Sequence, residues 1–274
     1  MMNKRDKNQR FLFVRQNDKR GQIAIFIIVA VILIASVGVY FFIVKPGALK
    51  TTIEKSDSPI YAYAEECIES SIFKSVEAFG LQQGYYIVPE DKSLDTSFYR
   101  IAYYYLEGET LIPENDFFEK EFSKIINDKI LEQCSDFSFF EEEGYEINAN
   151  IEGINSETQI SENDIRIDVA YPISIRTNES STSFSEFNYD LPLRVGHVVD
   201  VSRTLVEKIK ESPDSIDLTF LLNQDVDISI VDYDECNKIY IIIDENSTIN
   251  EEPYAFSFAV GFEKQYCSGE ESEQ

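Results

Sequence analysis

The feature that most constrains this chain is an apolar run of 22 residues at positions 23–44, which contains no charged residue and no Asn, Gln or Pro. At about 1.5 Å of rise per residue, a helix of this length measures roughly 33 Å and crosses a hydrocarbon layer of about 30 Å. A cleaved secretory signal is the main alternative, but its apolar core has only about 7–15 residues and ends in a small-x-small cleavage pattern, which is missing here. We therefore expect a single transmembrane helix at residues 23–44.

Charge is divided unevenly between the two sides of this run. Residues 1–22 hold seven Lys or Arg and two Asp, whereas the rest of the chain holds 17 basic and 48 acidic residues, a formal charge of −31. Basic residues next to a span stay on the cytoplasmic side, so we expect a basic cytoplasmic tail or leader at residues 1–22. The predicted localisation is the cell membrane, single-pass, with the N-terminus cytoplasmic and the C-terminal domain outside.

The strongly acidic outer part limits the partners that it can bind. Its charge repels phosphate backbones, so we expect no contact with nucleic acid. Cations or basic proteins fit better, although acidic side chains also simply keep an exposed domain soluble. The expected partners are the membrane, through residues 23–44, and other proteins or further copies of the chain, through the outer domain.

A short motif stands immediately before the apolar run and consists of Lys19, Arg20, Gly21 and Gln22. This motif resembles the class III signal of archaeal type IV pilin-like proteins. The resemblance implies that a membrane peptidase cuts after Gly21, so that Gln22 becomes the new N-terminus and the apolar helix is retained for packing into a filament core. The chain departs from many pilins in having Phe26 at the fifth position after the cut, where a Glu is common.

Three further short pieces occur in the outer part. They are Tyr-x-x-x-Cys at residues 63–67, Gln-Gly-Tyr at 83–85 and Phe-x-Phe-Ala-Val at 256–260. In these pieces the chain is similar to an uncharacterised archaeal family of membrane-anchored proteins. The resemblance implies a topology but no activity.

Apolar residues at every fourth position predict helices in the outer part. Residues 60–80 carry such a stripe directly after Pro59, which suits a first helical turn, and residues 115–134 carry a second stripe. These two helices should pack together, and a third helix is expected at 195–211. The predicted organisation is a tail or leader at 1–22, a transmembrane helix at 23–44, a linker at 45–59, an extracytoplasmic α+β domain at 60–268 and a disordered acidic tail at 269–274.

From about Tyr145 the apolar period changes to two, which predicts strands. Residues 238–243 are apolar on both faces and are expected in the middle of a sheet, whereas 244–253 are predicted as a loop. The aromatic cluster at 103–105 is expected in the core. The predicted fold class is α+β: a single N-terminal transmembrane helix, then an ectodomain with two packed helices followed by an antiparallel sheet with one more helix. The expected strands lie at 145–151, 165–171, 184–189, 226–231, 238–243 and 254–262.

Four cysteines follow the apolar run and none precedes it: Cys67, Cys134, Cys236 and Cys267. An even number on an oxidising side indicates disulfides rather than a zinc site, because there is no Cys-x-x-Cys spacing and only one histidine. Three pairings are possible. We favour Cys67 with Cys134, which lie on the two helices expected to pack, and Cys236 with Cys267, which flank the last predicted hairpin.

Two tripeptides of the Asn-x-Ser/Thr type begin at Asn178 and Asn246, each in a predicted loop. In an exposed domain such tripeptides are acceptors for N-glycosylation. Both asparagines are therefore candidate modification sites.

Residues suited to catalysis or metal binding are few. His197 is the only histidine, expected at the start of the third helix, and the chain contains no nucleotide-binding, zinc-protease or nucleophile-elbow motif. Four acids, Asp225, Asp227, Asp232 and Asp234, flank a predicted strand, but they lack the Gly and terminal Glu of a calcium loop and are expected to be solvated. We expect no cofactor, no metal and no enzymatic activity.

These features favour a membrane-tethered extracytoplasmic structural or interaction protein, pilin-like in type, that works by contact. Two alternatives remain open: an extracellular ligand-binding or sensor domain, and a wall-active hydrolase. A flat apolar patch on the surface would favour assembly, whereas a deep pocket with converging carboxylates would favour an enzyme.

Overall fold

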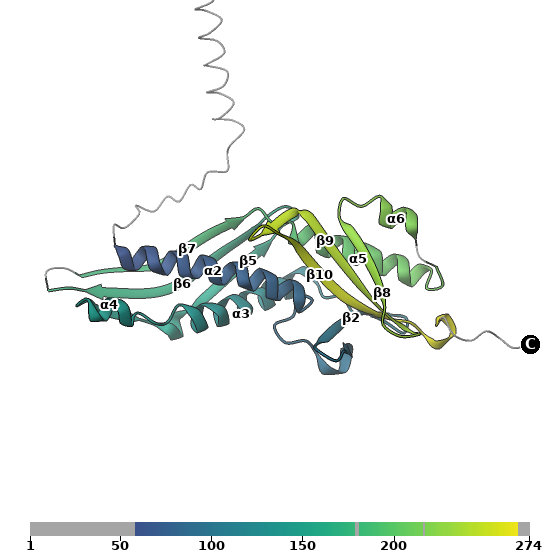
Figure 1. Cartoon of the computed structure of the whole chain (residues 1–274), viewed down its shortest axis with the longest axis horizontal. Helices are drawn as coiled ribbons and strands as arrows, with labels where there is room; N and C mark the ends of the chain where they lie inside the picture. Colours follow the sequence, from purple (N-terminus) through teal and green to yellow (C-terminus); the bar gives the residue numbers. More distant parts are fainter. Residues whose placement is uncertain (1–57, 179–180, 216, 268–274) are drawn as a thin grey trace, which may run out of the picture. The chain divides into compact units, whose positions relative to one another are not determined.

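The computed structural model describes residues 58–178, 181–215 and 217–267 (Figure 1). The predicted tail or leader at 1–22, the predicted transmembrane helix at 23–44 and nearly all of the predicted linker lie outside these residues, as does the acidic tail at 269–274. Among the helices that the structure describes, none is long and apolar enough to cross a membrane.

The fold class predicted from the sequence is wrong. It places a transmembrane helix before two packed helices and one antiparallel sheet, yet the described helices include no membrane span and the strands form two sheets. One sheet is mixed, because β2 (Arg100–Leu106) and β10 (Glu252–Gly261) run parallel. Strands also lie between the two packed helices rather than only after them. The described helices are α2 (Pro59–Leu81), α3 (Asn115–Gln133), α4 (Ser138–Glu142), α5 (Val195–Glu211) and α6 (Leu218–Leu222).

The first sheet has the order β1 (Ser93–Asp95), β2, β10, β9 (Asn237–Ile249) and β8 (Asp227–Asp232), and β3 (Glu109–Thr110) also pairs with β2. The prediction of an internal strand at 238–243 is confirmed, since β9 has a neighbour on each side. The prediction of a loop at 244–253 is wrong for its first part, because β9 continues to Ile249. Tyr103, Tyr104 and Tyr105 lie on β2 and are buried, as expected.

The second sheet is built around β6 (Ile165–Arg176), which pairs with β7 (Ser181–Leu191) on one side. On its other side β6 pairs with β4 (Glu146–Ala149) and β5 (Asn155–Ile160), and all these pairs are antiparallel. Apolar residues alternate with polar ones along β6, and the apolar set from Ile165 to Ile175 is buried. One face of this sheet therefore packs on the core, and the other face is polar.

Helix α2 packs against both α3 and the first sheet. The Phe79 ring lies 4.9 Å from that of Phe122 on α3 and 6.4 Å from that of Phe256 on β10, measured between centroids. The next residue is Gly80, and a Cβ atom there would lie 2.2 Å from the carbonyl oxygen of Ala255. The expected packing of the two helices is thus confirmed, and a glycine lets the end of α2 touch the backbone of β10.

The turn after α2 connects this helix to β2. Gln83 is fully buried, its side-chain oxygen accepts the backbone N–H of Ala102 at 3.0 Å, and its carbonyl oxygen accepts the hydroxyl of Tyr104 at 2.8 Å. Gly84 follows at a φ of 77°, and a Cβ atom there would overlap the ring of Phe118. Both the left-handed backbone and the lack of space for a side chain favour glycine at this position.

Both disulfides favoured from the sequence are present. Cys67 on α2 is bonded to Cys134 at the end of α3, and Cys236 is bonded to Cys267 beyond β10. The first disulfide joins the two packed helices. The second joins the β8–β9 turn to the segment after the last strand.

We predict that Tyr254→Phe leaves the free energy of unfolding unchanged or raises it by about 1 kcal/mol, because the buried Tyr254 hydroxyl has no hydrogen-bond partner among the described residues. The matched control is Tyr104→Phe, which removes the bond to Gln83 and is expected to cost about 1–3 kcal/mol. Urea denaturation of both variants measures the difference. A loss for Tyr254→Phe as large as that for Tyr104→Phe would contradict the prediction.

Candidate functional site

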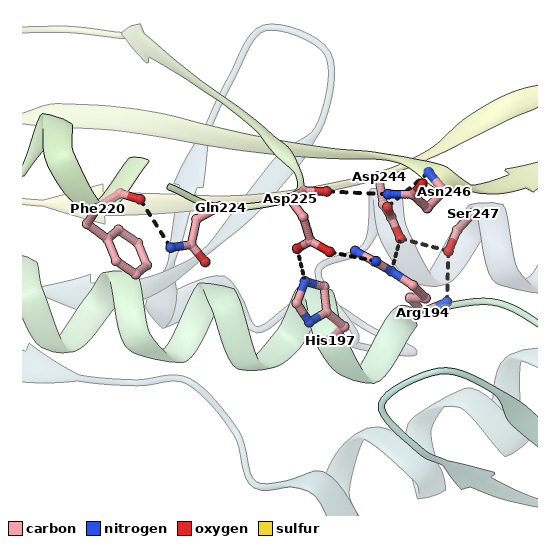
Figure 2. Close-up of polar contacts among 8 residues, drawn as sticks. All are labelled: Arg194, His197, Phe220, Gln224, Asp225, Asp244, Asn246 and Ser247. Atoms are coloured by element: carbon pink, nitrogen blue, oxygen red, sulfur yellow. Dashed lines mark hydrogen bonds and ion pairs between the residues drawn. The ribbon is translucent and has the colours of Figure 1, made fainter. Parts of the chain in front are cut away.

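The histidine lies in a polar cluster where the start of α5 meets β9 (Figure 2). Arg194 directly precedes α5, and its Nε donates to Asp244 at 3.0 Å while its Nη1 donates to Asp225 at 2.7 Å. Asp244 and Ser247 lie on β9 and are fully buried. The Ser247 hydroxyl donates to Asp244 at 2.7 Å and accepts the backbone N–H of Arg194 at 2.8 Å. The cluster therefore connects α5 to β9 through charged hydrogen bonds.

Asp225 and Arg194 shift each other's pKa in this cluster. The second carboxylate oxygen of Asp225 lies 2.7 Å from Nε2 of His197. The hydrogen bond from Arg194, assisted by the one to His197 and opposed by burial, lowers the pKa of Asp225 to about 2. Asp225 in turn is the main cause that raises the pKa of Arg194. The pair is thus held in its charged form.

This cluster does not have the geometry of a Ser-His-Asp triad. In Figure 2, His197 and Ser247 lie on opposite sides of the Arg194 side chain, and the serine hydroxyl is bonded to Asp244 rather than to the imidazole. His197 lies in the first turn of α5, as expected. In such a triad the serine hydroxyl donates to the histidine, whereas Ser247 donates to Asp244, which is itself paired with Arg194. The geometry supports a structural role for the cluster, which fixes α5 on the sheet.

Sequence reasoning missed Arg194 and Asp244. Asp244 falls in the segment predicted as a loop because Asn, Ser and Glu are frequent there. The available signal was the strand period, since Asp244 follows the buried Tyr240 and Ile242 at alternate positions. A carboxylate at a buried position of a strand needs a basic partner, because an unpaired buried charge is costly.

The remaining predicted site residues fall in different places. Gly21 and Gln22 lie outside the described residues. Asn178 is exposed, but its tripeptide continues outside the described residues. Asn246 is exposed on β9, not in a loop, its amide lies 3.5 Å from the carbonyl oxygen of Asp225, and the hydroxyl of the following Ser247 is buried. The second tripeptide is therefore part of a strand and of the polar cluster.

The four predicted acids do not converge. Asp225 binds Arg194 and His197, Asp232 pairs with Lys238, and Asp234 accepts the backbone N–H groups of the β8–β9 turn. Within residues 58–178, 181–215 and 217–267, no group of three or more His, Cys, Asp or Glu side chains is placed to hold a metal ion.

The first sheet exposes an apolar surface on the side away from its core. Alternate residues of β9 point to opposite faces, so Tyr240 faces the core while Ile241 faces the other way. In the strand register, Ile241 lies between Ser229 and Ser257, and Ile243 lies beside Ala255. We call this surface the outer face. It consists of Ser229, Val231, Ile239, Ile241, Ile243, Ala255 and Ser257.

The helices that we describe pack on the opposite face of this sheet. Phe256 meets Phe79 of α2, and Tyr240 shares its face with Phe258, with a centroid distance of 5.6 Å. Ile241 and Ile243 belong to neither cluster of packed core residues and remain partly exposed, and Val231 is 46% exposed. Ile239 differs, because it packs against a small second cluster of buried residues, Leu94, Ile101, Tyr103 and Ala259. The apolar strip outside both clusters is therefore formed by Ile241 and Ile243.

The second sheet shows what an ordinary solvent-facing strand looks like in this protein. The outward positions of β6 include Arg166, Asp168, Ser174 and Arg176, all exposed. The outward positions of β9 carry isoleucines instead. Contiguous exposed apolar residues are unusual on a monomer surface and mark contact sites.

Carboxylates stand at one end of the outer face. Asp227 lies beside Ile243, and Glu245 follows it along β9. Both are exposed, and neither forms an ion pair with another described residue. The outer face thus presents an apolar strip with unpaired negative charge next to it.

No protein-family model, no curated protein and no solved structure matches this chain. The pilin-like motif at residues 19–22 and the likeness to an archaeal membrane-anchored family therefore stay predictions from the sequence. The function has to be argued from the described surfaces.

We predict that Arg194→Met lowers the free energy of unfolding by about 3–5 kcal/mol, because it leaves the buried carboxylate of Asp244 without its cationic partner. The matched control is Arg166→Met, whose partner Asp190 is exposed, so that the expected loss is below about 1 kcal/mol. Urea denaturation of both variants provides the comparison. Equal losses of unfolding free energy in the two variants would mean that the Arg194 cluster does not hold α5 on the sheet.

We also predict a pH-dependent contribution from Asp225. Its pKa in the folded protein is about 2, below the usual 3.8, so its carboxylate stabilises the fold above about pH 4 and loses this effect as the pH falls from about 4 to about 2. The stability difference between the wild type and Asp225→Asn should therefore shrink across this window. Denaturation curves at pH 6, 4 and 2.5 measure it, and a difference that stays constant would rule out this linkage.

Proposed function

We propose that this chain is a structural or interaction protein that is displayed on the outer side of a cell membrane and works by contact. Residues 23–44 would be its contact with the lipid, and the acidic domain would face outward. The two disulfides support an oxidising surrounding, because such bonds persist mainly in exported proteins. The charge difference between residues 1–22 and the rest of the chain supports the orientation.

The observation that carries this proposal is the outer face. Ile241 and Ile243 are partly exposed at outward positions of β9, whereas the outward positions of β6 carry charged and polar side chains. Burying such side chains in a contact stabilises it by roughly 25 cal/mol per Å² of apolar surface removed from water. A partner that covers Ile241 and Ile243 would therefore gain a favourable hydrophobic contribution.

The charge next to the outer face indicates the chemistry of the partner. Asp227 and Glu245 would favour a protein with basic residues beside an apolar strip. Two copies of this chain carry the same strongly negative formal charge of −26, and their mutual repulsion disfavours self-association. We therefore favour a different, basic protein over self-association through this face.

The test is site-specific photo-crosslinking of the full chain in its native membrane. A photoreactive residue in place of Ser257, on the outer face, is expected to form an adduct with a second protein. The same residue in place of Ser174, which is exposed on β6, serves as the control and should form none. Ile241→Thr, which keeps the β-branched shape, should reduce the adduct from position 257 about tenfold without changing the melting temperature.

Each outcome of the crosslinking either supports or contradicts the proposal. An adduct of twice the mass of the chain would show self-association instead of a basic partner. Equal adducts at positions 257 and 174, or none at either, would overturn the assignment of the outer face. Digestion of intact cells with protease tests the orientation independently, because an outward domain is degraded and a cytoplasmic one is protected.

A further inference from the structure

We propose that the cavity between the end of α5 and the inner face of β9 binds an alkylammonium group, from a free amine or from a lysine side chain. The cavity has a volume of about 440 Å³ and opens beside the segment that leads from α5 to α6. It lies on the core side of the first sheet, opposite the outer face. The inference therefore does not depend on the proposed contact site.

The floor of the cavity is apolar and aromatic. Leu205 and Ile209 come from α5, Tyr240 from β9 and Phe262 from the residue after β10, and Tyr266 stands at the edge. A volume of about 440 Å³ lies within the usual range for small-ligand sites, which are mostly apolar with a few polar groups. A short alkyl chain fits such a floor, and aromatic rings also attract cations.

Tyr240 supplies the polar group within the cavity. The residue is 1% exposed and lines the cavity. Its hydroxyl has no hydrogen-bond partner among the described residues, and it is not among the buried polar atoms that are sealed from solvent without a partner. The hydroxyl therefore faces the cavity, where a ligand N–H group can donate to it. Burial, with the negative charge of Asp232, raises the pKa of Tyr240 to about 12, so the hydroxyl is neutral at physiological pH.

The charged side chains around the opening determine whether a cation or an anion is favoured as the ligand. Two lysines line the cavity, but Lys208 pairs with Asp217 at 3.0 Å and Lys238 pairs with Asp232. Three further acids line it, Glu211, Asp214 and Glu235, and none of them forms an ion pair with a described residue. All three of these acids are exposed at the rim. Unpaired negative charge favours a cation over an anion.

The second disulfide holds two sides of this opening together. Glu235 immediately precedes Cys236, and Tyr266 immediately precedes Cys267. The bond between the two cysteines therefore keeps the carboxylate and the ring at a limited separation. A site with its groups already in place loses less entropy when a ligand binds.

The experiment is calorimetric titration of the full chain in nanodiscs with n-pentylamine, with empty nanodiscs as the blank. We expect saturable binding that 1-pentanol and pentanoate do not reproduce. Glu235→Gln combined with Asp214→Asn should weaken binding at least tenfold, and Tyr240→Phe should weaken it several-fold. The matched control, Glu186→Gln combined with Asp168→Asn, removes two exposed acids from the second sheet and should leave binding unchanged.

A second probe distinguishes the two sources of the ammonium group. Nα-acetyl-lysine methylamide should bind with comparable affinity if the natural ligand is a lysine side chain, and much more weakly if it is a free amine. Equal binding of 1-pentanol, stronger binding of pentanoate, or equal losses in the two double variants would overturn the proposal. Photo-crosslinking from position 257 should be unaffected by Tyr240→Phe, so that failure of this site and failure of the outer face remain distinguishable.

Discussion

The described domain depends on the packing of α2, because this helix touches both sheets. Near its start, the Tyr61 ring lies 5.0 Å from that of Phe184 and 5.5 Å from that of Phe187, both on β7. At its end, Phe79 and Gly80 meet β10 of the first sheet. Buried residues of both sheets therefore belong to one continuous hydrophobic cluster, and a small second cluster is formed by Leu94, Ile101, Tyr103 and Ala259 of the first sheet. Figure 1 shows α2 running along both sheets, beside α3.

The polar cluster at Arg194 adds a specific constraint to this apolar packing. Hydrophobic burial is non-directional, so it does not by itself decide how α5 lies on the sheet. A buried carboxylate such as Asp244 is costly without a partner, and the observed placement of the α5 start brings the Arg194 guanidinium to 3.0 Å from it. Such buried ionic groups add less to stability than to the choice of one arrangement. The single histidine belongs to this arrangement through Asp225.

With α2 and α5 on the inner side of the first sheet, strand β9 contributes side chains to two different surfaces. On β9, Tyr240 points toward the cavity below α5, while the neighbouring Ile241 points to the outer face. Unpaired acids accompany both surfaces, Glu235 at the cavity and Glu245 at the outer face. A few unpaired acids thus lie beside apolar surface in two places, which would favour a cationic or basic partner at each.

The sequence by itself determined the local structure of much of this protein. The apolar period of four located α2, α3 and α5, the run at 238–243 indicated an internal strand, and the positions of the cysteines indicated both disulfides. These features are local in origin, because periodicity and helix ends depend on residues close together in the chain. The tertiary structure alone decided that β2 pairs in parallel with β10, that Asp244 is buried against Arg194, and that Ile241 is left uncovered. Each of these depends on contacts between residues far apart in the chain, which no local pattern of residues specifies.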